Sequence, residues 1–256
     1  ERMKADIRNV DTCSGYEEML LSDEAFAGGV SHRGRDGVFA MKLHEHDKYN
    51  GSLRASKSWF FFGNRIVCMG SDIENKAGGG LHTTLFQNFL ENVSDTLVVN
   101  GEAVTQFPYR AELAGGAVLR DNLHNVWFVP EGKVCVTKRL QRSLDEETDA
   151  PTQNDFATAW IDHGSGVVSG GGYEYMLVVH ASDGEAARYA RELPYEVLRR
   201  DASAHILRDR LSGAVGYALF APGKVGEGLL ESVSLPSLVM IGGDGEGLTV
   251  SAADPD

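Results

Sequence analysis

The sequence predicts an all-β protein, a large antiparallel β-sandwich with one short helix. Three observations predict this fold class. About a dozen short segments have the apolar or alternating pattern of strands. The 30 glycines of the 256-residue chain, about 12% against a usual share of about 7%, are spread along its length in short turns. Only one segment combines the start, period and stop signals of a helix.

The first clear strand is Gly37–Leu43, in which Phe39, Met41 and Leu43 share one face, because successive side chains of a strand point to opposite sides. We expect this apolar face to pack in the core. Glu45 has the same parity and continues that face at its rim.

Two hairpins are expected next. Gly63-Asn64 separates the apolar runs Ser58–Phe62 and Arg65–Met69, and Asn100-Gly101 joins two short alternating runs. The second link is typical of a type I′ turn. Further strands are expected at Val126–Val129, Lys133–Thr137, Tyr173–His180, His205–Arg208, Gly216–Ala221, Ser237–Ile241 and Leu248–Ala252.

The single helix is expected after Ser182 or Asp183, either of which can cap its N-terminus. Glu185 lies in the first turn, and Pro194 ends the helical pattern. Many strands with one helix indicate a sandwich of two large sheets. No repeat or shift in composition divides the chain, so residues 1–256 are expected to form a single domain.

The charge balance restricts the partners. Lys and Arg number 24 against 37 Asp and Glu, a net charge of −13. This argues against a nucleic-acid partner, which needs a basic face, and requires any anionic ligand to meet a local basic cluster. No apolar run reaches the roughly 18 residues of a transmembrane helix, so no membrane partner is expected.

The three cysteines, Cys13, Cys68 and Cys135, lack the spacing of a metal site. Cys68 and Cys135 lie inside apolar, strand-like runs. Buried free thiols are therefore favoured over a disulfide.

The segment His44-Glu45-His46 carries two kinds of metal-ligating side chain. The two histidines would share one side of a strand and Glu45 the other, so zinc would need one or two ligands from elsewhere. A solvated strand end is the alternative for the histidines. Glu45 could orient an Arg, Tyr or His by a charge-assisted hydrogen bond, and an exposed carboxylate is its alternative.

Arg54 and Lys57 lie in the aromatic segment Leu53–Phe62. Cations beside aromatic faces suit sugars that carry carboxylate or sulfate, whereas aromatic residues in strands are also typical of a sandwich core. No P-loop, GxSxG or HExxH motif is present, so no single segment names a reaction.

Five segments are informative when they are taken in order: Ala25–Ser31 (AFAGGVS), Gly37–Leu43 (GVFAMKL), Leu53–Phe62 (LRASKSWFFF), Ile66–Asn75 (IVCMGSDIEN) and His82–Gln87 (HTTLFQ). In this order they resemble the central β-sandwich of polysaccharide lyase family 8, the chondroitin and hyaluronan lyases, with the broad-specificity chondroitin sulfate ABC lyases most similar. Later matches are Asn125–Pro130, Ala159–His163, Tyr173–His180, Pro194–Asp201 and Leu248–Pro255.

The resemblance implies a super-sandwich, galactose-mutarotase-like domain of a larger bacterial lyase, whose N-terminal helical toroid and C-terminal small β domain are absent from these residues. The chain begins at Glu1 and ends at Asp256 just after a strand-like run, which fits a domain cut from a longer protein. The family cleaves uronic-acid glycans by β-elimination in a cleft between toroid and sandwich. The isolated chain is therefore expected to be inactive.

In the family, the toroid supplies Tyr, His, Asn and Arg, and the sandwich supplies a Glu that orients the Arg and the Tyr. The resemblance assigns this catalytic role to Glu45, with Glu74 in reserve. One branch of the family has its Glu after an Asn-Gly pair, whereas Ser52 follows Asn50-Gly51 here. The expected substrate-binding residues are His32, Arg33, Arg35, Arg54 and Lys57.

The resemblance also implies the partners. An anionic glycosaminoglycan (chondroitin or dermatan sulfate, or hyaluronan) is the expected substrate, and an N-terminal helical domain of the same polypeptide is the expected packing partner. The enzyme is expected to be secreted or periplasmic. No metal or cofactor is expected in these residues, and a divalent cation, Ca²⁺ or Mg²⁺, is compatible with the full-length enzyme. The alternative function is a non-catalytic carbohydrate-binding or spacer sandwich, which the negative charge favours.

Overall fold

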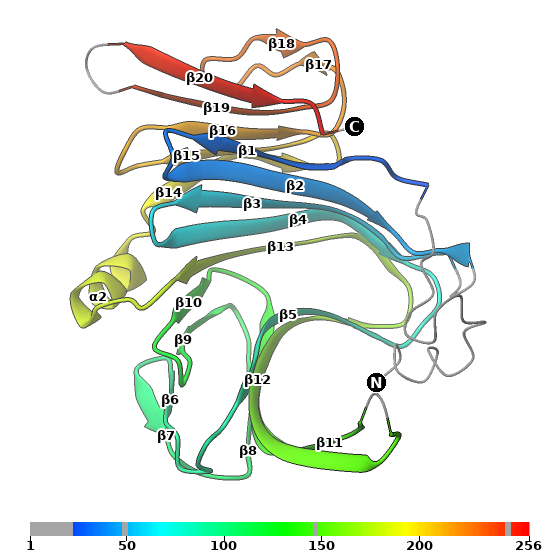
Figure 1. Ribbon diagram of the computed structural model, residues 1–256, viewed down its shortest axis with the longest axis vertical. Helices are drawn as coiled ribbons and strands as arrows, with labels where there is room; N and C mark the ends of the chain where they lie inside the picture. Colours follow the sequence, from blue (N-terminus) through cyan, green and yellow to red (C-terminus); the bar gives the residue numbers. More distant parts are fainter. Residues whose placement is uncertain (1–22, 48–50, 146–147, 244–246, 256) are drawn as a thin grey trace.

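The computed structural model describes residues 23–47, 51–145, 148–243 and 247–255. Three stacked antiparallel sheets, a small two-stranded sheet and one helix make up these residues (Figure 1). The all-β fold class is confirmed.

The nine-stranded sheet contains, in spatial order, β1 (Ala27–His32), β2 (Asp36–His44), β3 (Arg54–Phe62), β4 (Arg65–Asn75), β13 (Val168–Val178), β10 (Val126–Val129), β9 (Ala117–Arg120), β6 (Leu97–Val99) and β7 (Glu102–Val104). The four-stranded sheet contains β5 (Gly80–Phe89), β12 (Pro151–Ser165), β11 (Lys133–Leu144) and β8 (Tyr109–Leu113). The five-stranded sheet contains β14 (Tyr195–Asp201), β15 (Ala204–Asp209), β16 (Val215–Leu219), β19 (Ser237–Gly243) and β20 (Leu248–Ala253). The small sheet pairs β17 (Gly223–Lys224) with β18 (Ser232–Val233).

The nine-stranded sheet is the middle layer, with the five-stranded sheet on one face and the four-stranded sheet on the other (Figure 1). One core cluster joins Phe60 and Met69 of the middle sheet to Leu207 of the five-stranded sheet. A second cluster joins Cys68 of the middle sheet to Val134 of the four-stranded sheet. The expectation of two large sheets is therefore wrong, because the middle sheet is apolar on both faces and each face needs its own cover.

The local turn and cap signals are confirmed. Asn100 and Gly101 both have positive φ angles, 50° and 88°, as a type I′ turn requires. The helix, α2 (Asp183–Arg191), begins after the N-cap Ser182, whose side chain accepts a hydrogen bond from the Glu185 backbone N–H. The Glu185 carboxylate accepts in return from the Ser182 backbone N–H, which completes a capping box.

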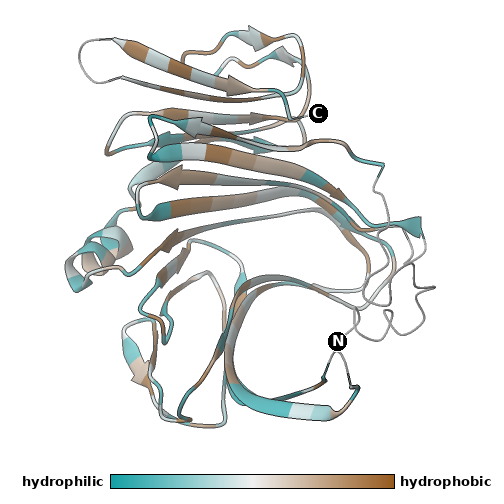
Figure 2. Cartoon of the chain, viewed as in Figure 1, coloured by the Kyte–Doolittle hydropathy of each residue, from teal (hydrophilic) through white to brown (hydrophobic). Residues whose placement is uncertain are grey.

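The hairpin of β11 and β12 is longer than expected, since β11 was predicted only as Lys133–Thr137. The additional residues are polar and largely exposed. Figure 2 shows the outer end of this hairpin as mainly hydrophilic, where it curls away from the layers. The apolar alternation that marks a strand exists only where the hairpin meets the middle sheet.

Burial corrects the expected core face of β2. Val38 and Ala40 are buried, whereas Phe39 is 38% exposed. The aromatic run of β3 divides in the same way, because Phe60 is fully buried and Trp59 is half-buried. The face of Phe39, Met41 and Leu43 is thus only partly covered.

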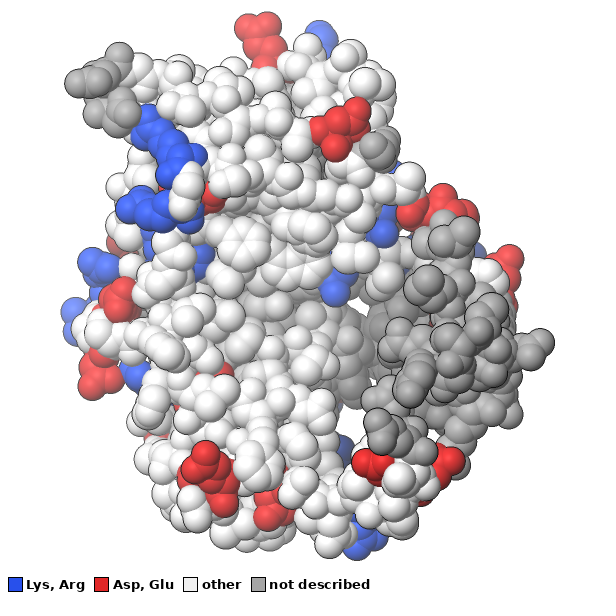
Figure 3. Space-filling view, in the orientation of Figure 1, with Lys and Arg blue, Asp and Glu red and all other residues white. Residues whose placement is uncertain are grey.

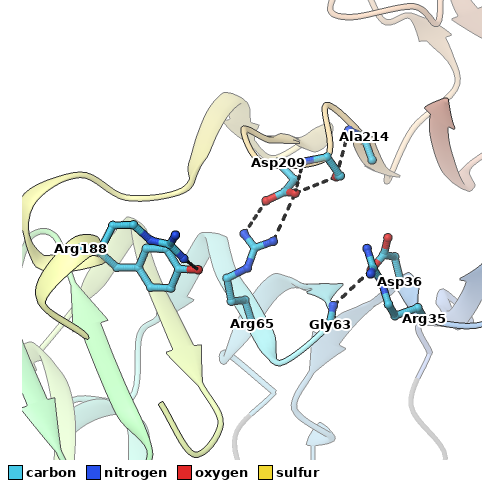
Figure 4. Close-up of polar contacts among 9 residues, drawn as sticks. Arg35, Asp36, Gly63, Arg65, Arg188, Asp209 and Ala214 are labelled. Atoms are coloured by element: carbon cyan, nitrogen blue, oxygen red, sulfur yellow. Dashed lines mark hydrogen bonds and ion pairs between the residues drawn. The ribbon is translucent and has the colours of Figure 1, made fainter. Parts of the chain in front are cut away.

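Two buried polar contacts join the middle sheet to the five-stranded sheet. The His205 ring on β15 lies between two serine hydroxyls of the middle sheet, with Nδ1 2.7 Å from Ser58 Oγ and Nε2 2.8 Å from Ser71 Oγ. The Arg65 guanidinium on β4 donates to the Asp209 carboxylate on β15 at 2.5 and 3.3 Å (Figure 4). Asp209 is fully buried. Burial opposes its charge, but hydrogen bonds from Arg65 and Ser212 hold the pKa of this carboxyl below its usual value.

Within the described ranges, no helix is long and apolar enough to cross a membrane.

We predict that Arg65→Met lowers the free energy of unfolding by about 3–5 kcal/mol, because it leaves a buried carboxylate without its countercharge. Chemical denaturation followed by fluorescence measures this loss. Arg35→Met is the matched control, because its contact with Asp36 is exposed on the arginine side and is worth at most about 1 kcal/mol. Equal losses in the two variants would contradict the structural role of Arg65.

We predict that His205 makes the protein acid-sensitive. Burial lowers the pKa of His205 to about 3, whereas an unfolded histidine titrates near 6.5. The stabilisation is complete above about pH 6.5 and is lost as pH falls toward 3, because only the unfolded chain takes up the proton there. Between pH 7 and 5 this amounts to about 2 kcal/mol. His205→Gln should flatten the unfolding free energy over this range, and the exposed-site variant His180→Asn should not.

We predict that Cys68 and Cys135 react with an aqueous thiol reagent only after denaturation. Both are buried free cysteines, as expected from the sequence, and burial raises the pKa of Cys68 to about 12 and also raises that of Cys135. The raised pKa keeps each cysteine as the unreactive thiol rather than the thiolate, and burial keeps the reagent away from the sulfur. Cys13 lies outside the described residues, so the labelling uses a Cys13→Ser background. Fast labelling of the native protein would contradict the burial.

Candidate functional site

Three neighbouring strands of the middle sheet bring Glu45, Arg54 and Glu74 to one end. The Glu45 backbone N–H, just after β2, donates to the Leu53 carbonyl at 2.8 Å. His44 lies opposite Arg54 on β3, and Arg54 lies opposite Glu74 on β4. We call Glu45, Arg54 and Glu74 the carboxylate end. It contains the catalytic candidate, its reserve and one of the expected substrate-binding cations.

The His44 ring fixes the chain beside Glu45. Its Nδ1 is hydrogen-bonded to the Asp23 carboxylate, and its Nε2 lies 3.1 Å from the Gly51 carbonyl oxygen. The bond to Asp23 is the main cause that raises the pKa of His44. Both ring nitrogens are therefore engaged, which argues against the metal interpretation of His44-Glu45-His46. Among the described residues, no group of three or more His, Cys, Asp or Glu side chains is arranged for a metal ion.

A line of side chains on one face of β2 and β3 runs toward the carboxylate end. We call it the aromatic strip, and it comprises Phe39, Met41, Lys57 and Trp59. The rings of Phe39 and Trp59 lie 5.5 Å apart at 52°, and Lys57 Nζ lies 5.4 Å from the Trp59 ring. Met41 and Lys57 are directly opposite on the two strands. Burial lowers the pKa of Lys57. In Figure 3 the centre of this view is largely uncharged, with Lys, Arg, Asp and Glu mostly toward its edges.

The other three substrate-binding candidates lie at the opposite end of β2. His32, Arg33 and Arg35 belong to the turn between β1 and β2. The nine residues of β2 place this turn about 26 Å from the carboxylate end, at about 3.3 Å per residue. The structure therefore does not bring the seven candidates together, because a single extended strand separates them.

His32 is 1% exposed, so it lies where no ligand can meet it. Its Nδ1 lies 3.0 Å from Ser251 Oγ on β20, and burial lowers its pKa. Arg33 donates to Thr249 Oγ1 at 3.1 and 3.3 Å. These contacts attach the β1–β2 turn to the five-stranded sheet, which is a structural role. Substrate binding by Arg33 and Arg35 stays a prediction.

Sequence reasoning missed a groove of about 990 Å³ on the four-stranded sheet. Its lining residues are His82, Thr84, Gln87, Arg139, Leu140, Gln141, Arg142, Ser143, Thr152, Gln153, Asn154, Phe156, Thr158 and Trp160. The sequence Phe156–Trp160 contains a signal for it, because the alanines at 157 and 159 alternate with larger side chains. Such alternation indicates a strand that packs its small residues in the core and leaves its other face uncovered.

Comparison with known proteins agrees with this architecture. The model of polysaccharide lyase family 8, super-sandwich domain, matches residues 2–190. The chain is 37% identical to a chondroitin sulfate ABC exolyase of Bacteroides thetaiotaomicron, covering 99% of this chain and 24% of that protein. It is 31% identical to the chondroitin sulfate ABC endolyase of Proteus vulgaris, covering 98% of this chain and 25% of that protein.

The solved structure of Paenibacillus xanthan lyase superposes with a TM-score of 0.81 at 24% identity, over 94% of this chain and 24% of that chain. This likeness concerns the fold alone. The chain spans about a quarter of the length of the curated relatives it matches. With the family model matching most of its residues, the chain belongs to polysaccharide lyase family 8 and carries its super-sandwich domain.

Proposed function

We propose that this chain is the sandwich part of a lyase that cleaves glycosaminoglycans, such as chondroitin or dermatan sulfate or hyaluronan, by β-elimination. It would form one wall of the substrate cleft and contribute Glu45. The chondroitin lyase relatives support the substrate class. The observation that carries the assignment to Glu45 is its position at the end of β2, where it continues the face that carries the aromatic strip.

The reaction removes the C5 proton of the uronate, breaks the C4–O4 bond and forms a C4=C5 double bond, and the departing oxygen takes up a proton. The α-proton is removable only if the charge that develops on the carboxylate is stabilised. The base, the acid and the carboxylate-binding groups would come from the helical part of the longer protein. Glu45 would act as a positioning residue that holds an arginine and a tyrosine of that part.

The carboxylate end suits this role physically. Glu45 is half-buried, so its charge would be less screened by water than that of a fully exposed carboxylate. The His44–Asp23 contact and the bond from Glu45 N–H to Leu53 fix the backbone on which it stands. Lys57 of the aromatic strip lies opposite Met41, on the face that Glu45 continues, and would offer positive charge to a uronate or sulfate group.

The surroundings of the complete enzyme are part of the same proposal. The sandwich would pack on an N-terminal helical domain, and the protein would act outside the cytoplasm, where polymeric glycans are met. A Ca²⁺ or Mg²⁺ ion would belong to the longer protein.

We predict that Glu45→Gln in the longer polypeptide lowers kcat roughly ten- to a hundred-fold with nearly normal stability. Gln keeps the shape but loses a charge-assisted bond worth about 1.5–3 kcal/mol, at about 1.4 kcal/mol per decade of rate. A surface carboxylate would change stability by less than about 0.5 kcal/mol. Absorbance of the unsaturated uronate measures kcat, and thermal melting measures stability.

Glu231→Gln, on the far side of the five-stranded sheet between β17 and β18, is the matched control and should leave kcat unchanged. A normal rate for Glu45→Gln with a reduced rate for Glu74→Gln would move the role to Glu74. Absence of any lyase activity in the longer polypeptide would favour the carbohydrate-binding or spacer function instead.

A further inference from the structure

The groove on the four-stranded sheet is shaped by the curvature of β5, β12 and β11, which curl around an opening (Figure 1). Along β12 the side chains alternate. Ala157 and Ala159 are fully buried in the core cluster shared with the middle sheet, and Phe156, Thr158 and Trp160 line the groove. The packing of one face of β12 in the core therefore fixes the position of the opposite face, which lines the groove.

The charge of the groove opposes that of the chain. Its lining contains two arginines, Arg139 and Arg142, and no Asp or Glu, although the net charge of the chain is −13. Arg139 makes no hydrogen bond or ion pair with another residue of the described ranges, and Arg142 donates to Gln153 at 3.4 Å. A local concentration of cations in a hollow attracts anions despite the opposite overall field.

The uncharged lining suits sugar rings. The rings of His82 and Trp160 lie 5.3 Å apart at 33° and offer flat surfaces to apolar ring faces. Gln87 donates to Gln141 at 2.5 Å, and Gln141 donates to Thr158 at 2.8 Å. Amide and hydroxyl groups both donate and accept hydrogen bonds, as sugar hydroxyls require.

The groove is long. Thr152 to Trp160 follow β12 for about 26 Å at about 3.3 Å per residue, which fits an oligosaccharide better than one sugar.

We propose that this groove binds an anionic oligosaccharide, a run of sugars bearing uronate or sulfate groups. Arg139, which lies opposite Phe156, meets an acidic group, and the Trp160 and His82 rings lie against sugar faces. The inference rests on the proposed lyase function and adds to it a place where the polymer is held away from Glu45.

Isothermal titration of the 256-residue chain with a chondroitin 4-sulfate octasaccharide tests the groove. Arg139→Gln should weaken binding about ten-fold, as expected for a charge-assisted hydrogen bond, and added salt should weaken it further. Trp160→Ala should weaken it several-fold, and Trp160→Phe should restore most of the affinity. Arg191→Gln, which removes an exposed arginine of α2, is the matched control and should bind normally. Thermal melting verifies that each variant is folded.

Normal binding by folded Arg139→Gln and Trp160→Ala would overturn the proposal, as would an absence of binding to the unsubstituted chain. Equal affinity for a poly-glutamate peptide would also overturn it, because charge alone would then explain the binding. None of these results concerns catalysis, which the Glu45→Gln assay in the longer polypeptide measures. The experiments therefore distinguish a failure of the proposal that the groove binds an oligosaccharide from a failure of the proposed lyase function.

Discussion

Coverage of the nine-stranded sheet on both faces is the constraint on which the rest of this structure depends. Its central strand β4 is buried on both faces along most of its length, and β3 is buried on one face, so each buried polar group there needs a partner within the protein. The His205 ring is hydrogen-bonded to Ser58 and Ser71, and Asp209 accepts a hydrogen bond from Arg65. Since both partners come from β15, the same contacts also fix the five-stranded sheet in place.

The aromatic strip and the groove, the two surfaces proposed for function, lie on sheet faces that no further sheet covers completely. The four-stranded sheet covers only part of the middle sheet, which leaves Phe39 and Trp59 partly exposed on β2 and β3. The groove lies on the other face of that same covering sheet. Because the backbone of packed strands forms both surfaces, a ligand would meet sites whose shape exists before binding, and such sites lose little conformational entropy on binding.

The sequence predicted what neighbouring residues determine. Asn100-Gly101 specifies its own turn, and Ser182 with Glu185 specifies the start of α2, because each contact spans only a few residues. The third layer was not predicted, since an apolar run that is buried on both faces looks the same as one in a simple core. The site divides similarly. His44, Arg54 and Glu74 are brought together by hairpins, whereas the burial of His32 depends on Ser251, far away in the sequence.

The Arg65–Asp209 ion pair has a consequence for how β4 finds its pairing. Because β4 is apolar on both faces, its hydrophobic residues alone distinguish poorly between the correct strand register and one shifted by a single residue. A shift by one residue would turn Arg65 toward the four-stranded sheet, away from Asp209, and leave two charges buried without partners. The Arg65–Asp209 ion pair thus specifies the correct register of β4, which the apolar pattern of the strand does not specify.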